Sequence, residues 1–147
     1  MELSSKIAML YDKDSSAAYK SLQELEMISN TEDTLYPYFD EFLDMLGNGK
    51  YLIRVRGFRL LCKQAKWDTE NKIDREIDTV LQAVDDEKPT AVRQKLKALE
   101  DVSRYKKALR GKIKNKALSI NDLPFKDTMH SLIQKDVQSL LQVMENE

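Results

Sequence analysis

Histidine and cysteine, two residue types that often perform acid–base and covalent chemistry, occur once each in this 147-residue chain. His130 is the single histidine, and it follows Asp127 at a spacing that places both side chains on one face of a helix. His130 could serve as a general base, but a surface or half-buried helix residue is the simpler interpretation, because catalytic constellations are rare. Cys62 falls on an apolar stripe between Phe58 and Ala65, which predicts a buried, unreactive thiol.

Other short patterns do not predict a catalytic or cofactor site. Gly47-Asn48-Gly49 is not followed by the Lys-Ser/Thr of a phosphate-binding loop, and we expect it to end a helix. Asp85-Asp86-Glu87 lacks the alternating ligands of a calcium loop and predicts a solvated turn. With one cysteine there is no multi-cysteine metal site. The sequence therefore predicts a protein that is not an enzyme and that uses no metal or cofactor.

Basic side chains carry the strongest functional signal. Residues 1–49 hold 3 basic and 10 acidic side chains, residues 50–121 hold 19 and 10, and residues 122–147 hold 2 and 5. The surplus of positive charge in the middle of the chain favours an anionic partner. We expect nine residues of this region to bind it: Arg54, Arg56, Arg59, Lys63, Arg93, Lys97, Arg104, Lys107 and Arg110.

Helices must position these side chains, because apolar residues recur at helical spacing along nearly the whole chain. Only four Gly and three Pro are present, which favours helix over strand. Asn30 is the expected N-cap of the third helix, and Asp68 or Thr69 that of the fifth. The sequence predicts an all-α fold with no strand and a break at residues 121–124. The expected helices include residues 3–10, 14–29, 35–46, 50–66, 73–84, 89–109 and 127–145.

The composition also bears on the cellular compartment of the protein. No stretch approaches the ~20 apolar residues that a helix needs to span a bilayer. The amino terminus lacks the basic and apolar regions of a signal peptide. A single cysteine permits no internal disulfide, and a reducing compartment suits it. These features predict one domain, residues 1–147, in the cytoplasm.

The expected helices form pairs whose sequences are alike. Val55-Arg56, Cys62 and Ala65 are matched 37 residues later by Val92-Arg93, Leu99 and Val102. The preceding helices match at an offset of 38, where Leu35, Phe39, Leu43 and Leu46 correspond to Ile73, Ile77, Leu81 and Val84. Ala18, Leu25 and Ile28 form a weaker copy one period upstream. Self-similarity at such a period is typical of solenoids, in which stacked helix pairs share one core.

These residues carry a family resemblance. Pro37-Tyr38-Phe39-x-x-Phe42-Leu43, followed by Val55-Arg56, resembles a HEAT repeat, and so does Val80-Leu81-x-x-Val84-Asp85-Asp86, followed by Val92-Arg93. The resemblance covers roughly residues 14–110 and extends to small bacterial HEAT-like proteins, some of them labelled SufBD-like. It implies an armadillo-type, right-handed α–α superhelix of about three helix pairs (residues 3–29, 32–67 and 69–110) and a C-terminal capping helix (127–145).

The resemblance also suggests where a partner would bind. In such solenoids the second helices of successive pairs line the concave surface. We therefore expect a non-enzymatic scaffold that binds a protein or an acidic peptide there, through the nine basic residues. The alternative is a nucleic-acid-binding protein that uses the basic residues between 50 and 121. In that alternative Tyr51, Trp67 and Tyr105 could stack on bases.

Structural roles compete with binding roles for several of these residues. Arg56 and Arg93 occupy the position that defines the repeat, where an arginine often binds a turn carboxylate such as Asp85. The stretch from Val102 to Asn121 has seven basic and no acidic side chains, and a solvated helix end is an equally good interpretation of it. Trp67 more simply closes the joint between two helices.

Overall fold

The computed structural model describes residues 2–120 and 125–145, and the regular structure within them is entirely helical, which confirms the predicted all-α class. The α-helices are α1 (Leu3–Ala8), α2 (Ser15–Thr31), α3 (Phe39–Met45), α4 (Tyr51–Lys63), α5 (Lys72–Gln82), α6 (Pro89–Tyr105), α7 (Arg110–Ser119) and α8 (Asp127–Glu145). Short 3₁₀ turns lie between them: η1 (Met9–Tyr11), η2 (Tyr36–Tyr38), η3 (Gln64–Trp67) and η4 (Lys107–Leu109). Among the described helices none is both long and apolar enough to cross a lipid bilayer.

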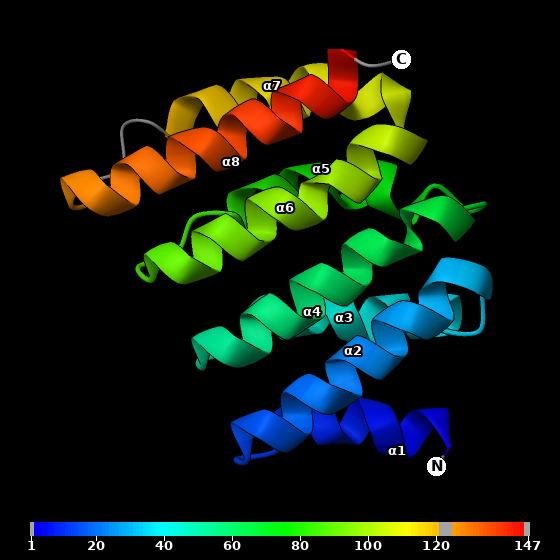
Figure 1. Cartoon of the computed structure of the whole chain (residues 1–147). Helices are drawn as coiled ribbons and strands as arrows, with labels where there is room; N and C mark the ends of the chain where they lie inside the picture. The colour runs from blue at the N-terminus through cyan, green and yellow to red at the C-terminus, as the bar shows by residue number, and fades with distance from the viewer. Residues whose placement is uncertain (1, 121–124, 146–147) are drawn as a thin grey trace.

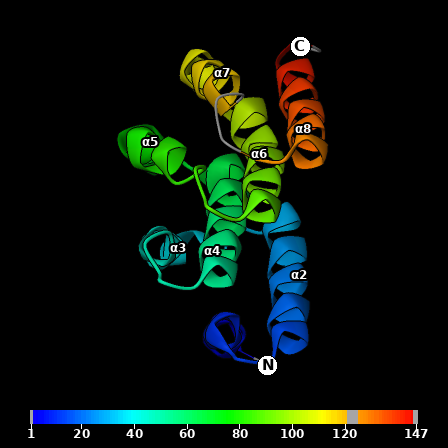
Figure 2. The same cartoon turned by 90° about the vertical axis from the view of Figure 1, so that its left-hand side faces the viewer.

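The α-helices lie in two layers (Figure 1). The helices α2, α4, α6 and α8 lie side by side in chain order and form the even-numbered layer, and α1, α3, α5 and α7 lie behind it. Within the even-numbered layer α4 packs against α2 and α6, and α6 also packs against α8. Figure 2 shows that this layer is bent, with α2 and α8 displaced away from the odd-numbered helices relative to α4 and α6.

One apolar core joins the two layers and runs from α1 to α8. Its largest side chains include Phe39 and Phe42 of α3 and Phe58 of α4, all fully buried. Gly57 allows α3 and α4 to approach closely. A Cβ atom at that position would lie 2.5 Å from the Met45 Cβ and 2.9 Å from the Phe42 carbonyl oxygen. The helical apolar stripes of the sequence therefore become a single shared core.

Aspartate side chains start two of the helices. Asp14 accepts hydrogen bonds from the amides of Ser16 (3.0 Å) and Ala17 (3.2 Å) at the start of α2. Asp68 accepts from the amides of Lys72 (2.8 Å) and Ile73 (2.9 Å), and so serves the first turn of α5. The N-cap residue itself is Asn71, so the predicted position of Asp68 or Thr69 is wrong, although the Asp68 side chain accepts the first amides of the helix.

The third predicted helix starts later than expected. Asn30 lies in the last turn of α2 and is not an N-cap, because the apolar stripe keeps α2 helical to Thr31. The Asn30 side-chain oxygen instead accepts a hydrogen bond from Lys63 at 3.1 Å. The next helical residues are those of η2, where Pro37 suits the first turn of a helix, and α3 follows directly.

The lysine-rich stretch differs most from expectation. The sixth helix was expected to continue to Leu109, but α6 ends at Tyr105 and Lys106 leaves the helical conformation with φ −125° and ψ 70°. A separate helix, α7, then packs against α6 and α8. The closing helix has the predicted bounds 127–145, and α8 packs against both α6 and α7. The predicted break at 121–124 lies outside the described residues.

Candidate binding groove

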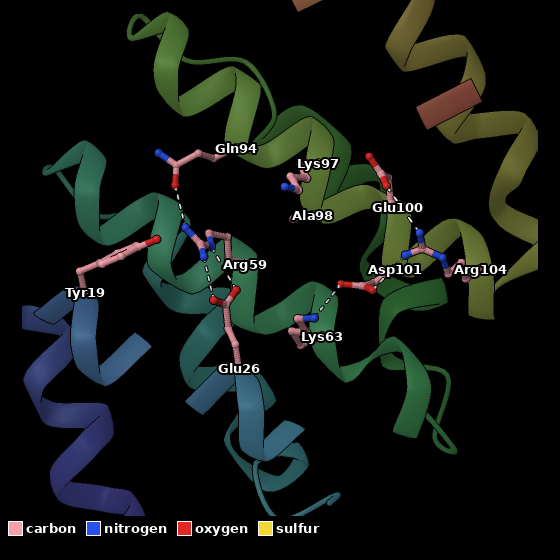
Figure 3. A pocket seen from close by; sticks show the side chains of 10 residues that line it. All are labelled: Tyr19, Glu26, Arg59, Lys63, Gln94, Lys97, Ala98, Glu100, Asp101 and Arg104. Carbon is pink, nitrogen blue, oxygen red and sulfur yellow. Dashed lines mark hydrogen bonds and ion pairs between the residues drawn. The ribbon is translucent and has the colours of Figure 1, made fainter. Parts of the chain in front are cut away.

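Four of the nine predicted partner-binding residues line one groove across α2, α4 and α6, with a volume of about 670 Å³. They are Arg59 and Lys63 of α4, and Lys97 and Arg104 of α6. The remaining lining residues are Tyr19 and Glu26 of α2, and Gln94, Ala98, Glu100 and Asp101 of α6 (Figure 3). All three helices belong to the even-numbered layer.

Arg59 links the three helices of the groove. Its Nε and Nη2 atoms lie 3.0 and 2.7 Å from the two carboxylate oxygens of Glu26. Its Nη1 donates to the Gln94 side-chain oxygen at 2.9 Å, and its guanidinium carbon lies 5.7 Å from the centre of the Tyr19 ring. Burial alone would lower the pKa of Arg59, but the hydrogen bonds and charge of Glu26 raise it. The guanidinium is therefore a fixed part of the groove.

At the other end of the groove the distances between oppositely charged groups are longer. Asp101 lies 3.6 Å from the Lys63 ammonium and 3.5 Å from the Arg104 guanidinium, and Glu100 lies 3.6 Å from Arg104. Burial raises the pKa of both carboxyl groups. Lys97 is exposed and forms neither a hydrogen bond nor an ion pair with the described residues. Lys97 and Arg104 are thus the cations most open to a ligand.

The charge of the groove is more balanced than expected. Its four basic side chains face three acidic ones, Glu26, Glu100 and Asp101, which the interpretation of the sequence did not select. The repeat period is the signal that could have found them, because Glu26 and Gln94 lie 33 and 35 residues from Arg59, close to one period. The short spacing from Glu100 to Arg104 is a second such signal.

Comparison with known proteins does not assign a ligand to the groove. No family model, curated protein or solved structure matches this chain. The resemblance to HEAT repeats therefore rests on the residues of the chain alone. The function has to be argued from the geometry of the groove.

Two other residues predicted to bind a partner, Arg54 and Arg93, form ion pairs with aspartates of neighbouring segments. Arg54 binds Asp86 through its Nε and Nη2 atoms at 3.1 and 3.2 Å. The Nε of Arg93 lies 2.7 Å from a carboxylate oxygen of Asp136 on α8. The expected pairing of Arg56 and Arg93 with a turn carboxylate is therefore wrong, and Arg54, two residues before Arg56, makes such a contact instead. Asp85 instead lies 2.8 Å from the ammonium of Lys116.

The last three of the nine residues predicted to bind a partner are Arg56, Lys107 and Arg110, and they also lie outside the groove. Arg56 is buried, with 5% of its surface exposed, and donates to the Leu10 carbonyl at 2.8 Å. Arg110 donates to the carbonyl oxygens of Ser103 (2.8 Å) and Met144 (3.3 Å), and so holds α7 to α6 and α8. Lys107 is exposed on η4 and does not line the groove.

Three residues considered for catalysis or for base stacking, Cys62, His130 and Trp67, are buried or hydrogen-bonded within the fold. Cys62 is fully buried, as predicted, and burial raises the pKa of its thiol well above the usual value. His130 is half-buried, and its Nε2 lies 3.1 Å from the amide nitrogen of Gln134. The indole of Trp67 donates to the Ser29 carbonyl at 2.7 Å and closes the joint between α2 and η3, as predicted. Within residues 2–120 and 125–145 no group of His, Cys, Asp and Glu could hold a metal ion.

Proposed function

We propose that this chain is a HEAT-like α-solenoid that acts as a non-enzymatic scaffold and binds an acidic segment of a partner protein. The binding surface is the groove over α2, α4 and α6. The observation that carries the proposal is the meeting of side chains from three successive second helices around one groove, with Lys97 and Arg104 left open at its surface. The period of 37 residues and the order of the helix pairs support the repeat architecture.

The strengths of the ion pairs support an acidic ligand. Exposed ion pairs contribute only about 0–1 kcal/mol, so the long contacts of Arg104, which is 46% exposed, can be exchanged for a ligand carboxylate at little cost. Arg59 is held in two-point contact by Glu26 and would keep the shape of the groove while this exchange occurs. Tyr19, also 46% exposed, offers an apolar and aromatic edge to the same ligand.

Nucleic-acid binding has less support in this geometry. A phosphate backbone laid in the groove would meet the carboxylates of Glu26, Glu100 and Asp101. Arg54 and Arg93, which would extend a basic track along the layer, are already neutralised by aspartates. The two functions differ in salt dependence, because binding to phosphates releases counterions and weakens steeply as salt rises.

An array of short peptides graded in acidic content tests the proposal. We expect the wild-type protein to retain the acidic peptides and the variant Lys97→Glu/Arg104→Glu to lose at least about tenfold in affinity, the equivalent of roughly 1.4 kcal/mol. The matched control is Lys112→Glu/Lys114→Glu, which makes the same charge change on exposed positions of α7, outside the groove.

Two outcomes would contradict the proposal. Equal loss in the groove variant and the α7 control would mean that net charge, and not the groove, selects the peptides. Retention of generic DNA or RNA at low salt, with a steep decline as salt rises and no retention of acidic peptides, would favour the nucleic-acid alternative. Capture from native lysate with the wild-type protein, the groove variant and the α7 control variant would then identify the natural partner.

A further inference from the structure

A second pocket lies at a different edge of the molecule, where the turns within successive helix pairs come together. Its volume is about 370 Å³, within the range of sites that hold small molecules. In Figure 1 the α1–α2 turn, the start of α4 and the α5–α6 turn lie along the left edge. The pocket is lined by residues of these three segments: Tyr11, Asp12, Lys13, Ser15, Gly49, Lys50, Tyr51, Leu52, Ile53, Arg56 and Glu87.

Arg56 is the unusual member of this set. It is 95% buried, and its only hydrogen bond to a described residue runs from Nη1 to the Leu10 carbonyl at 2.8 Å. No described carboxylate lies within ion-pair distance of it, although Asp12 and Glu87 also line the pocket. Arg93, one repeat later, has Asp136 as its counter-charge. A buried guanidinium has five N–H donors and strongly favours an anion, so its remaining donors suit a ligand in the pocket.

The start of α4 adds a second, independent preference for an anion in the same place. No side chain caps this 13-residue helix at Lys50, and its first turn contains no acidic residue. The amides of Tyr51 and Leu52 are therefore without a side-chain acceptor at the positive end of the helix dipole. Because residues 49–53 line the pocket together with Arg56, the helix terminus and the guanidinium act on one space.

The charged side chains at the rim favour the same ligand. Lys13 and Lys50 are exposed and offset the exposed Asp12 and Glu87, which leaves the charge of Arg56 in surplus. Asp12 is directed to its own turn, since it accepts a hydrogen bond from the Asp14 amide at 2.8 Å. We infer that the pocket binds a small organic anion, whose phosphate or carboxylate oxygens contact Arg56 and the first amides of α4.

The side chains that line the pocket indicate what is attached to the anionic group of the ligand. Tyr51 and Leu52 are half-buried and Ile53 is buried, so apolar surface adjoins the site of charge. A planar or aliphatic body attached to the oxyanion would cover that surface. This site shares no residue with the groove over α2, α4 and α6, so each can be tested without the other.

Amide chemical shifts of the full chain provide the test. Phenyl phosphate, benzoate and inorganic phosphate are titrated separately at constant ionic strength, with chloride as the reference anion. We expect saturable shifts at Tyr51, Leu52 and Ile53, with phenyl phosphate or benzoate binding at least tenfold more tightly than inorganic phosphate. The better of the two organic probes distinguishes a phosphate from a carboxylate ligand. Shifts that do not saturate, or that appear equally with chloride, would overturn the proposal.

Two variants and one control locate the site. Arg56→Met removes the guanidinium and should abolish the saturable shifts, whereas Arg93→Met removes the matching guanidinium of the next repeat and should preserve them. Gly49→Asp covers the case in which Arg56→Met does not fold. A Cβ atom added at Gly49 meets no atom within 4 Å, so we expect this variant to fold and to place a competing carboxylate beside the helix start. Binding by Gly49→Asp with wild-type affinity would overturn the proposal.

Discussion

Arg59 and Glu26 form a two-point ion pair, with nitrogen–oxygen distances of 3.0 and 2.7 Å, across the interface between α4 and α2. Both side chains are about four-fifths buried, so water competes for the contact less than at an open surface. The same guanidinium reaches Gln94 on α6. One residue of the groove therefore holds together the three helices that form it.

This pair should contribute measurably to folding. We expect Arg59→Met to lower the free energy of unfolding by about 1–3 kcal/mol, because it leaves the partly buried Glu26 carboxylate without its charged donor. A double-mutant cycle with Glu26→Gln should give a coupling energy of about 1 kcal/mol in urea denaturation. A coupling energy close to zero would show that the contact is no stronger than an exposed pair.

Asp86 should matter far more to stability than its neighbour Asp85. The Asp86 carboxylate is 1% exposed and lies 3.1 Å from both Arg54 and Lys95, of which Lys95 is itself buried. Replacing it with alanine leaves these cations without a counter-charge and should cost about 3–5 kcal/mol. Asp85→Ala, at a half-exposed carboxylate paired with Lys116, is the control and should change stability by less than about 1 kcal/mol. Urea denaturation of both variants gives the comparison, and similar losses would contradict it.

Acid should weaken the fold through the same carboxylate. Burial alone would raise the pKa of Asp86, but hydrogen bonds from Arg54, the Lys88 amide and Lys95 lower it below the usual value. A lowered pKa in the folded state means stability that is present above the unfolded value of about 3.9 and is lost as the pH falls through the folded value. Unfolding free energies at pH 7, 5 and 3 should therefore decline most below pH 4. Asp86→Asn, which cannot titrate, should lose less on acidification, and an equal loss would exclude this origin.

Two glycines in helices should respond oppositely to alanine. A Cβ atom at Gly57 would meet Met45 and the backbone of Phe42, so Gly57→Ala should cost about 1–3 kcal/mol despite the better helix propensity of alanine. Gly111 lies in α7 with no atom within 4 Å of the added carbon, and Gly111→Ala should stabilise the protein by about 0.5–1 kcal/mol. Thermal unfolding of the two variants measures both signs. A stabilising Gly57→Ala would show that α3 and α4 can separate without cost.

Periodicity predicted the elements well where the apolar stripe is wide. The bounds of α8 follow from it, because Ile133, Val137 and Leu140 recur at helical spacing and are buried. It failed at α7, where Ile113 and Ala117 supply a narrow buried stripe among lysines. A short stripe of this kind is hard to distinguish from a solvated helix end until α8 is placed beside it.

The candidate site was harder to predict than the helices. The role of a charged side chain depends on which groups it meets in the folded protein, and the spacing of residues in the sequence does not give these contacts. Arg54 and Arg56 are half a turn apart on α4, yet Arg54 meets Asp86 and Arg56 is buried against Leu10. Their sequence neighbourhoods do not distinguish these outcomes. Similarly, a count of basic residues could not show that Lys97 is open while Arg93 is held by Asp136.

The bent even-numbered layer is tied along its length by charged and polar contacts, from Glu26 to Arg59, from Arg59 to Gln94, and from Arg93 to Asp136. The odd-numbered layer is joined to it by apolar packing, as where α3 meets α4 at Gly57. Ionic strength screens the first kind of contact and strengthens the second only slightly. Raising the salt concentration should therefore weaken the more exposed of these polar contacts, such as that between Arg93 and Asp136, while the apolar core stays intact.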